Sequence, residues 1–426
     1  MLNIVMLMIC IQPVEIQEFT LDNGLKILVY EDHFAPVVST QIHYRVGAYN
    51  EPLGLTGISH LLEHMAFKGT KKYGAQEYWR RIEEAGGMAN AYTSANRTVY
   101  FANLGKDRYE IELELEAERM QNLLIAEAEF IPEKQVVMEE RRLRENDPYG
   151  SFFEQLDLVS YSIHPYRRPI IGFMADIERI SRDDLYQWYR QHYNPANAVV
   201  VIAGDVTAEE AYRAVRKHFG KIKGRTVDEI PYEEPAQRGE RRFEYRKEVR
   251  TSALAIHYHT VNIVHEDVYA LDVLSMILSY GLSSRFEQDI VREQGLAVTA
   301  NVYHMKYKYA GSFLVFAIPQ SGVKLADLEH AIHESIDRLK TIPVSAAELD
   351  KARNQTLASA VYQQDSPTGV GMRAGWWEIE AGGWRNMNRY FEEIGSVNEG
   401  DIMRVARTYF TRDNRTVGYL LPEEEE

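Results

Sequence analysis

Two histidines four residues apart, with a glutamate directly before the second, offer the clearest chemistry in this chain. They stand in the segment His60-Leu61-Leu62-Glu63-His64. On a helix of about 3.6 residues per turn, positions four apart lie on one face, so both imidazoles can reach one metal ion. Glu63 lies beside them, where its carboxylate can contact a water molecule on the metal without being a ligand. The order is the reverse of H-E-x-x-H, and both orders are known from zinc enzymes.

The residues around this motif favour a short helix. Thr56 and Gly57 provide a turn and a cap before it, and Gly69 is placed to end it. The apolar face opposite the two histidines is formed by Leu61, Leu62, Met65 and Ala66.

A catalytic zinc site usually has three protein ligands and one open position, so a further ligand is needed. A second predicted helix, residues 132–142, carries Glu133, Glu139 and Glu140. Glu133 and Glu140 are seven residues apart and therefore lie on one stripe, two turns apart. Because the region is dense in charge, a solvated acidic helix is the alternative.

Composition narrows the class of protein. A chain of 426 residues is long enough for two domains or more, and 45% hydrophobic residues fit a soluble globular protein. The net charge of −15 argues against nucleic acid as a partner, which needs a basic surface. Cys10 is the single cysteine, so the chain has neither an internal disulfide nor a thiolate zinc site.

The first eleven residues, Met1 to Ile11, are apolar but lack a basic start and are too short to span a bilayer. We interpret them as the remains of a secretion signal, which favours an extracytoplasmic (periplasmic) location over the cytoplasm. A buried or frayed N-terminal strand is the alternative. No transmembrane segment is predicted.

The two halves of the chain read as copies of one unit. Predicted strands at 37–44 and 251–258 have similar alternation, and those at 98–104 and 311–318 follow at matching places. Strands mixed with long helices, without a strict βαβ rhythm, predict α+β domains with largely antiparallel sheets. The second copy of the metal-site helix, 271–278, has no histidine, so the sequence predicts one metal site per chain.

The boundary between the copies falls in a stretch of Gly, Pro and charged residues. We therefore predict a catalytic zinc-binding domain at residues 1–222, a linker at 223–242 and a metal-free homologous domain at 243–426.

Taken with its surroundings, the histidine motif resembles a known family. The run from Gly57 to Thr70, GISHLLEHMAFKGT, is similar to the signature of the insulinase, pitrilysin and mitochondrial processing peptidase group of inverted zinc metallopeptidases. Similarity, closest to the bacterial two-domain members, extends from Thr20 to Phe410. It implies two duplicated αβ-roll domains that form half of a clamshell chamber, in which unfolded or short peptides are cleaved.

The resemblance also implies the ligand set. The family's third ligand ends a hydrophobic segment like Val136-Val137-Met138-Glu139-Glu140, which places Glu140 in register. Glu139, turned about 100° away on the helix, is the alternative. One zinc ion per chain would be held by His60, His64 and Glu140.

Further roles follow from the same resemblance. Glu63 would be the general base. Glu133 matches a family glutamate seven residues before the third ligand and would orient a ligand from outside the metal's own shell. Asn90 and Ala91 lie in a predicted edge strand to which a peptide would add by main-chain bonds, with a plain hairpin as the alternative.

One departure from the family bears on partners. In members that work as a closed pair, a Gly-x-Ser-Ser-Arg run is followed in the sequence by an Arg and a Tyr, seven residues apart, that grip the substrate. Here the run is present and ends at Arg285. Val291 and Val298 occupy the positions of the Arg and the Tyr, and Arg292 lies one residue after the Arg position. We therefore predict a heterodimer with a related subunit that carries the Arg/Tyr pair, or else a homodimer. A non-catalytic assembly subunit of the same fold is the rival function, which loss of a metal ligand would favour.

Overall fold

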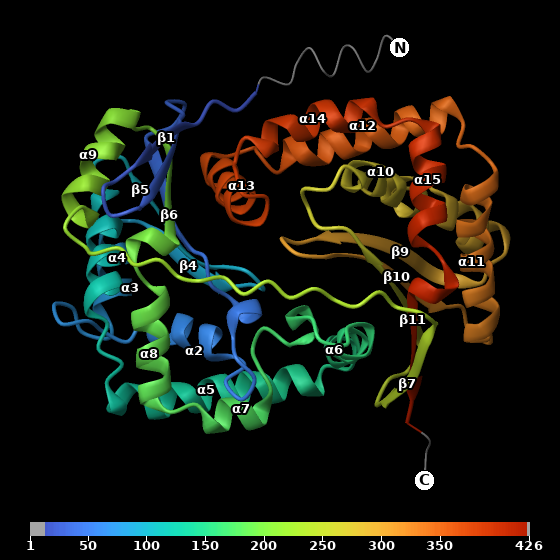
Figure 1. Ribbon diagram of the computed structural model, residues 1–426, viewed down its shortest axis with the longest axis horizontal. Helices are drawn as coiled ribbons and strands as arrows, with labels where there is room; N and C mark the ends of the chain where they lie inside the picture. Colours follow the sequence, from blue (N-terminus) through green and yellow to red (C-terminus); the bar gives the residue numbers. More distant parts are fainter. Residues whose placement is uncertain (1–12, 424–426) are drawn as a thin grey trace.

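The computed structural model describes residues 13–423 as two facing halves, each built from one sheet and its helices (Figure 1). The predicted signal remnant at Met1 to Ile11, and Cys10 within it, lie outside the described residues. Among the described residues, no helix is both long enough and apolar enough to cross a bilayer.

The first sheet has six strands in the order β1-β2-β6-β3-β5-β4. Strands β2 and β6 are parallel and the other neighbours are antiparallel, and β4 forms a free edge. The strands are β1 Gln17–Thr20, β2 Lys26–Glu31, β3 Val37–Tyr44, β4 Met88–Thr93, β5 Thr98–Gly105 and β6 Ala198–Gly204. The helices of this half are α2 Ile58–Met65, α3 Glu77–Glu84, α4 Glu110–Asn122, α5 Glu127–Asn146, α6 Pro148–Ser160, α7 Met174–Arg179, α8 Arg182–His192 and α9 Ala208–Phe219.

The second sheet repeats this topology in the order β7-β11-β8-β10-β9. Its parallel pair is β7 and β11, which corresponds to β2 and β6 of the first sheet, and it ends at the free edge of β9. Strand β9 is therefore the counterpart of β4, and the α+β prediction is confirmed. The strands are β7 Arg241–Lys247, β8 Ala253–Thr260, β9 Ala297–Lys306, β10 Gly311–Pro319 and β11 Arg415–Pro422. The helices are α10 Asp267–Ser279, a π-helix at Phe286–Glu293, α11 Leu325–Thr341, α12 Ala346–Tyr362, α13 Pro367–Glu380, α14 Asn386–Ser396 and α15 Glu399–Tyr409.

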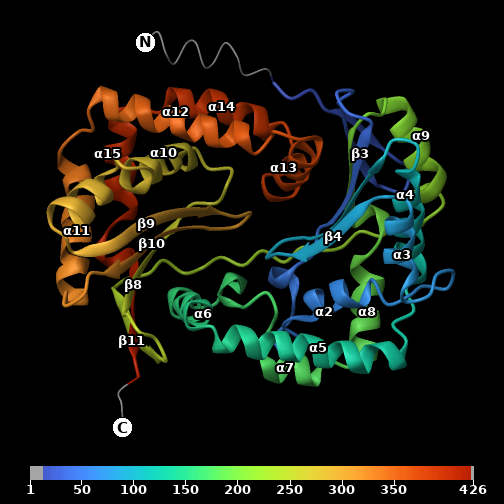
Figure 2. The same ribbon diagram turned by 180° about the vertical axis from the view of Figure 1, so that it is seen from behind.

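One helix of each half packs against the sheet of the other half. Helix α6 packs Phe152 and Leu156 into an apolar cluster with residues of β8 and β11. Helix α13 crosses to β3, and its glycines permit a close approach: a Cβ on Gly375 would lie 2.3 Å from the ring of His43. Figures 1 and 2 show both crossings from opposite sides. The predicted domain bounds at residues 222 and 243 stay a prediction.

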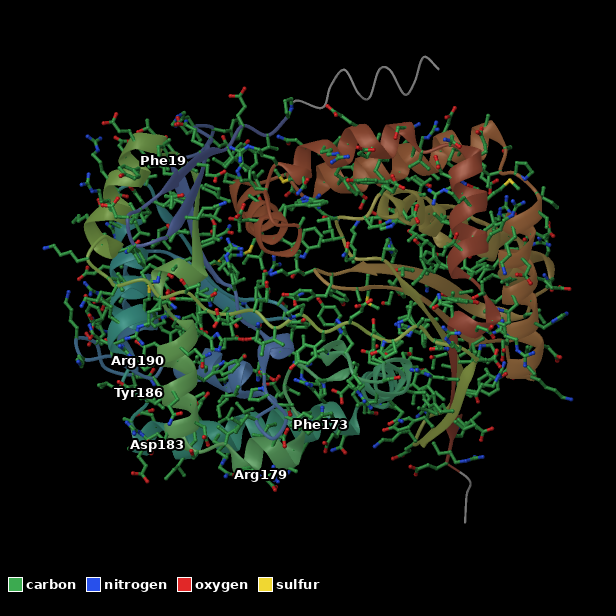
Figure 3. The ribbon with its side chains drawn as sticks, viewed as in Figure 1. Phe19, Phe173, Arg179, Asp183, Tyr186 and Arg190 are labelled. Atoms are coloured by element: carbon green, nitrogen blue, oxygen red, sulfur yellow. The ribbon has the colours of Figure 1, made fainter. Side chains whose placement is uncertain are left out.

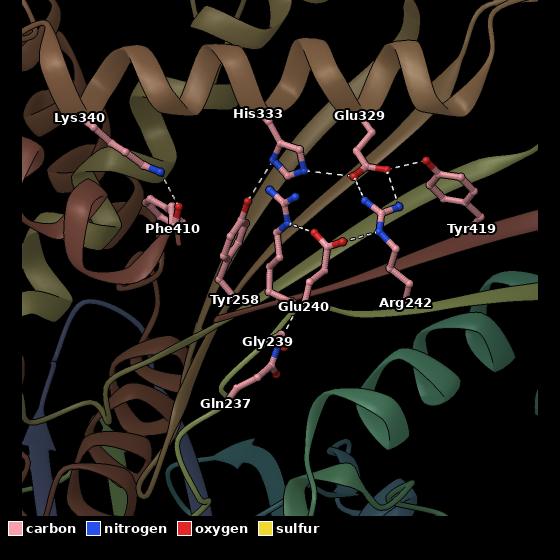
Figure 4. Close-up of polar contacts among 11 residues, drawn as sticks. Gln237, Gly239, Glu240, Arg242, Tyr258, Glu329, His333, Lys340, Phe410 and Tyr419 are labelled. Atoms are coloured by element: carbon pink, nitrogen blue, oxygen red, sulfur yellow. Dashed lines mark hydrogen bonds and ion pairs between the residues drawn. The ribbon is translucent and has the colours of Figure 1, made fainter. Parts of the chain in front are cut away.

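The connection between the halves has no helix or strand from residue 223 to 240. Its end is fastened to the second half by a polar network (Figure 4). Gln237 donates to the Arg415 carbonyl at 2.7 Å, and the Glu240 carboxylate pairs with both Arg242 and Arg415. Arg242 in turn pairs with Glu329 of α11.

The helices outside the first sheet face solvent on their far side. Phe19 of β1 meets Tyr212 of α9 with ring centroids 5.1 Å apart, which ties the edge of the sheet to its covering helix (Figure 3). Arg179, Asp183 and Arg190 lie on the outside of α7 and α8 in the same view. The inner faces of these helices build the core behind the histidine motif.

Candidate metal centre

Helix α2 begins in a position that only glycine tolerates. Gly57 has φ +88°, and a Cβ there would lie 2.2 Å from the carbonyl oxygen of Ile171. The buried Glu51 carboxylate accepts from the backbone N–H groups of Gly57 and Ser59 at 2.7 and 2.9 Å, which satisfies donors that a helix start leaves unpaired. Burial raises the pKa of Glu51 to about 8, although the hydrogen bonds from the two backbone N–H groups act to lower it.

Gly57, one of the two residues expected to provide the turn and cap, is the N-cap of this helix. Thr56 is not a cap, because its hydroxyl donates to Asp176 Oδ2 at 2.7 Å. The expectation that Gly69 ends the helix is wrong, since the helix stops at Met65 with Ala66 as its cap. The histidine motif is helical throughout, as its spacing predicts.

Helix α5 packs on α2 and brings a third side chain to the two histidines. Glu140 Oε2 lies 3.8 Å from His60 Nε2 and 3.6 Å from His64 Nε2. One nitrogen or oxygen from each of the three residues fits within 4.8 Å of the others. Tetrahedral zinc with bonds of about 2.0–2.1 Å holds its ligand atoms about 3.3–3.4 Å apart, so these three residues fit the ion.

Burial and charge differ sharply between these three side chains. Burial lowers the pKa of His60 to about 4, which keeps its imidazole neutral as a ligand must be. Burial also acts to lower the pKa of His64, but hydrogen bonds to Glu133 and Glu140 outweigh it and raise that pKa to about 9. The hydrogen bond to His64, with a second to Arg144, holds the pKa of Glu140 near 2.

Glu133 lies behind His64. Its Oε1 is 2.9 Å from His64 Nδ1, and its Oε2 pairs with Lys68 Nζ at 2.5 Å. Despite burial, which acts to raise it, these contacts lower the pKa of Glu133. The pair fixes the ring so that Nε2 faces Glu140.

Glu63 faces the first sheet from α2. Its Oε2 accepts a hydrogen bond of 2.6 Å from the Thr93 hydroxyl of β4. Burial raises the pKa of Glu63, while the Thr93 bond acts in the opposite direction. Glu139, by contrast, is exposed and pairs with Arg142 at 2.8 Å, away from both histidines.

The predicted edge strand is β4, at the free edge of the first sheet. Asn90 is exposed there, and its side-chain oxygen accepts from the Ala91 N–H at 2.8 Å. Ala91 and Thr93 lie two apart and share one face of the strand, and both line the cavity described next.

A cavity of about 850 Å³ opens in front of the motif. His60, Glu63 and Glu140 line one side of it. The opposite wall is formed by α6 and the second sheet, with Phe153 and Met305 among its residues. The site therefore lies in a space shared by both halves.

Val291 and Val298 lie elsewhere. Val291 packs against the core of the second half, and Val298 is 55% exposed on β9. Neither lines the cavity in front of the histidines.

Sequence reasoning missed three side chains that support the site. Thr93 is signalled by the two-residue period from Ala91, and Lys68 by its place one turn beyond His64. Glu51 carries no local signal, because its bonds to the start of α2 depend on the path of the loop between them.

Comparisons with known proteins identify the family. Residues 26–173 match the insulinase family, peptidase family M16, and residues 179–356 match the family's inactive domain. A Helicobacter pylori protein named zinc protease PqqE is 33% identical over 95% of this chain and 93% of its own length. A probable mitochondrial-processing peptidase subunit beta of Schizosaccharomyces pombe is 26% identical over 91% of this chain and 87% of its own length.

Solved structures lead to the same family. The crystal structure of a protease from Helicobacter pylori is 32% identical, covers 96% of this chain and 100% of its own, and superposes with a TM-score of 0.91. A putative M16-like peptidase from Alicyclobacillus acidocaldarius, 18% identical over 97% of this chain and 99% of its own, shares the fold with a TM-score of 0.84. The chain belongs to the insulinase family of zinc proteases, peptidase family M16.

Proposed function

We propose that this chain is a zinc-dependent endopeptidase that cleaves unfolded or short peptides, with one zinc ion held by His60, His64 and Glu140. The observation that carries the proposal is the meeting of these three side chains at 3.6 and 3.8 Å, beside the half-buried carboxylate of Glu63. The rival function, an assembly subunit without activity, has no missing ligand to support it.

Each residue of the site has a different role in the proposed reaction. When bound, zinc supplies Lewis acidity, which polarises a peptide carbonyl and makes water more acidic. Glu63 accepts the proton of the attacking water on its carboxylate and then donates it to the leaving amine. Thr93 orients the Glu63 carboxylate by its 2.6 Å hydrogen bond, and Glu133 orients His64.

An extended peptide would add to the free edge of β4. In this proposal Asn90 and Ala91 bind it through main-chain groups, displacing the hydrogen bond between the Asn90 side chain and the Ala91 N–H. The cavity between the halves favours short or unfolded peptides as substrates, because a folded domain would not reach the histidine motif in the cavity wall.

The proposal is tested by metal analysis and peptide hydrolysis. The purified chain should contain one zinc per chain and cleave an internally quenched peptide, and a chelator should abolish cleavage while the circular dichroism spectrum stays unchanged. His64→Ala should lose both metal and activity. Full zinc occupancy in His64→Ala, or cleavage that survives chelation, would overturn the assignment.

A further inference from the structure

A second cavity, of about 470 Å³, lies away from the histidine motif and shares no lining residue with the first. Helices α10, α12, α13 and α14 and strand β9 of the second half surround it. Arg97, from the turn between β4 and β5, reaches it from the first half. Its volume is that of a small-molecule site.

Positive charge dominates the lining of this cavity. Arg97, Lys306 and Arg373 are its permanent cations, and Asp272 is its single carboxylate. In a chain with a net charge of −15, such a concentration of basic residues around one cavity is unexpected.

Asp272 is already fully engaged. It pairs with Lys306, accepts from the Tyr390 hydroxyl at 2.5 Å and lies 2.7 Å from His304 Nδ1. It therefore neutralises Lys306 and leaves the two guanidinium groups without a matching carboxylate in the lining. Glu380, which does not line the cavity, interacts electrostatically with Arg97, but it accepts its hydrogen bonds from Asn96 at 2.7 Å and from a backbone N–H.

The lining residues also have donors to spare. Within residues 13–423, four buried N–H donors of these residues have no hydrogen-bond partner, and no buried side-chain oxygen of the lining is in that state. Buried polar groups are nearly always paired, so an unmatched set of one kind indicates a missing partner of the other kind. The four donors are Arg97 Nε and Nη1, Arg373 Nε and Trp377 Nε1.

We propose that this cavity is a binding site for a small oxyanion, of the phosphate or carboxylate class, held by Arg97 and Arg373. An oxyanion only accepts hydrogen bonds, which is what the unmatched nitrogens require, and guanidinium groups match its geometry in pairs. Arg97 is only 8% exposed, and Glu380 accepts its hydrogen bonds from other donors, so a bound anion would stabilise the buried charge of Arg97 further. Gln363, exposed at the rim, already accepts from Arg373 Nη1 and holds its guanidinium in place.

The site is connected to the metal centre through the β4–β5 turn. Arg97 Nη2 donates to the Tyr92 hydroxyl at 2.8 Å, and the next residue, Thr93, donates to Glu63. A bound oxyanion would therefore hold the turn at residues 94–97 and, through it, the strand that orients Glu63. The site binds an effector and does not take part in the reaction itself.

Binding is tested on the full-length chain without any peptide, so the result is independent of the proposed peptidase activity. Inorganic phosphate is titrated at constant ionic strength, with chloride as the balancing ion, and followed by calorimetry and by the shift in melting temperature. Acetate and citrate, titrated in the same way, distinguish carboxylates from phosphate. We expect saturable binding of phosphate or of a carboxylate.

Three variants locate the bound ion. Arg373→Gln and Arg97→Gln should each weaken binding about tenfold or more, because each removes charge-assisted hydrogen bonds. Arg389→Gln is the matched control: it removes an arginine from α14 that is exposed, pairs with Glu393 and does not line the cavity. Its binding should equal that of the parent chain.

A second readout tests the connection to the metal centre. Hydrogen exchange at residues 94–97 should slow when the ion is bound in the parent chain and in Arg389→Gln, but not in Arg373→Gln. The proposal is overturned if none of the anions binds saturably, or if binding is the same in Arg373→Gln and Arg97→Gln as in the control.

Discussion

Glu63 lies at the junction of the two elements that build the proposed active site, since it belongs to α2 and is bonded to Thr93 of β4. Glu63 is not one of the three proposed zinc ligands, so replacing it should leave zinc binding intact. Glu63→Gln should keep zinc and peptide binding but lose about 10²–10⁴-fold in turnover, because the amide cannot accept the proton. Single-turnover hydrolysis and metal analysis measure the two effects separately. A near-normal kcat would require another base.

Glu133 acts on the metal site indirectly, through the ring of His64. Glu133→Gln keeps the size of the side chain and one acceptor but removes the charge that pairs with Lys68. We expect zinc affinity or activity to fall about 10–100-fold, the usual effect of losing a residue that orients a metal-bound histidine. Competition with a chromogenic chelator measures the affinity. If zinc affinity and rate are both unchanged, Glu133 has no part in the site.

At the scale of elements, α2 depends on the left-handed conformation of Gly57 at its start. Gly57→Ala should lower the free energy of unfolding by about 1–3 kcal/mol or more, because a side chain at φ +88° is strained and its Cβ would meet the Ile171 carbonyl. Gly74→Ala is the control, since a Cβ there meets nothing closer than 3.8 Å. Equal urea midpoints for the two variants would contradict this reading.

Helix α11 is joined to the second sheet by an ionic contact that should respond to acid. Burial acts to raise the pKa of Glu329, but hydrogen bonds from His333, Arg242 and Tyr419 outweigh it and lower that pKa to about 2 (Figure 4). The folded pKa lies below the unfolded value, so the stabilisation is complete above about pH 4.5 and is lost as pH falls toward 2.

Glu329→Gln tests this contact. At pH 7 the variant should be less stable than the parent chain by about 2 kcal/mol. The difference should shrink as urea unfolding is repeated between pH 5 and pH 3. A difference in stability that does not change with pH would mean that packing, and not charge, accounts for the stabilisation by Glu329.

At the scale of the whole molecule, the two halves share both the cavity and the helices around it. The wall facing the motif comes from α6 and the second sheet, yet Val291 and Val298, at the places of the family's gripping pair, lie outside that cavity. We therefore expect the chain to work best with a related chain that carries the Arg/Tyr pair.

The measurement compares peptide hydrolysis by the purified chain with hydrolysis after a neighbouring related chain is added, alongside sedimentation analysis of both samples. Stimulation with a mixed dimer supports the heterodimer, and weak activity of a self-associated chain supports the homodimer. Full turnover by a solitary monomer would exclude both.

Much of this architecture could be predicted from local sequence. The spacing of His60, Glu63 and His64 determines a shared helix face, because helical period depends on the backbone alone. Repeated strand patterns indicate the duplication, which the matching order of the two sheets displays. The run from Gly57 to Thr70 is similar to a family signature, so the family can be inferred from these local residues alone.

Only the tertiary structure decided what surrounds these elements. It separates Glu140, which meets both histidines, from its neighbour Glu139, which turns to solvent. It places Thr93 on Glu63, exchanges α6 and α13 between the halves, and gathers basic residues as distant as Arg97 and Arg373 around one cavity. These contacts join segments far apart in the chain, so they follow from how whole faces pack and not from the period of any one element.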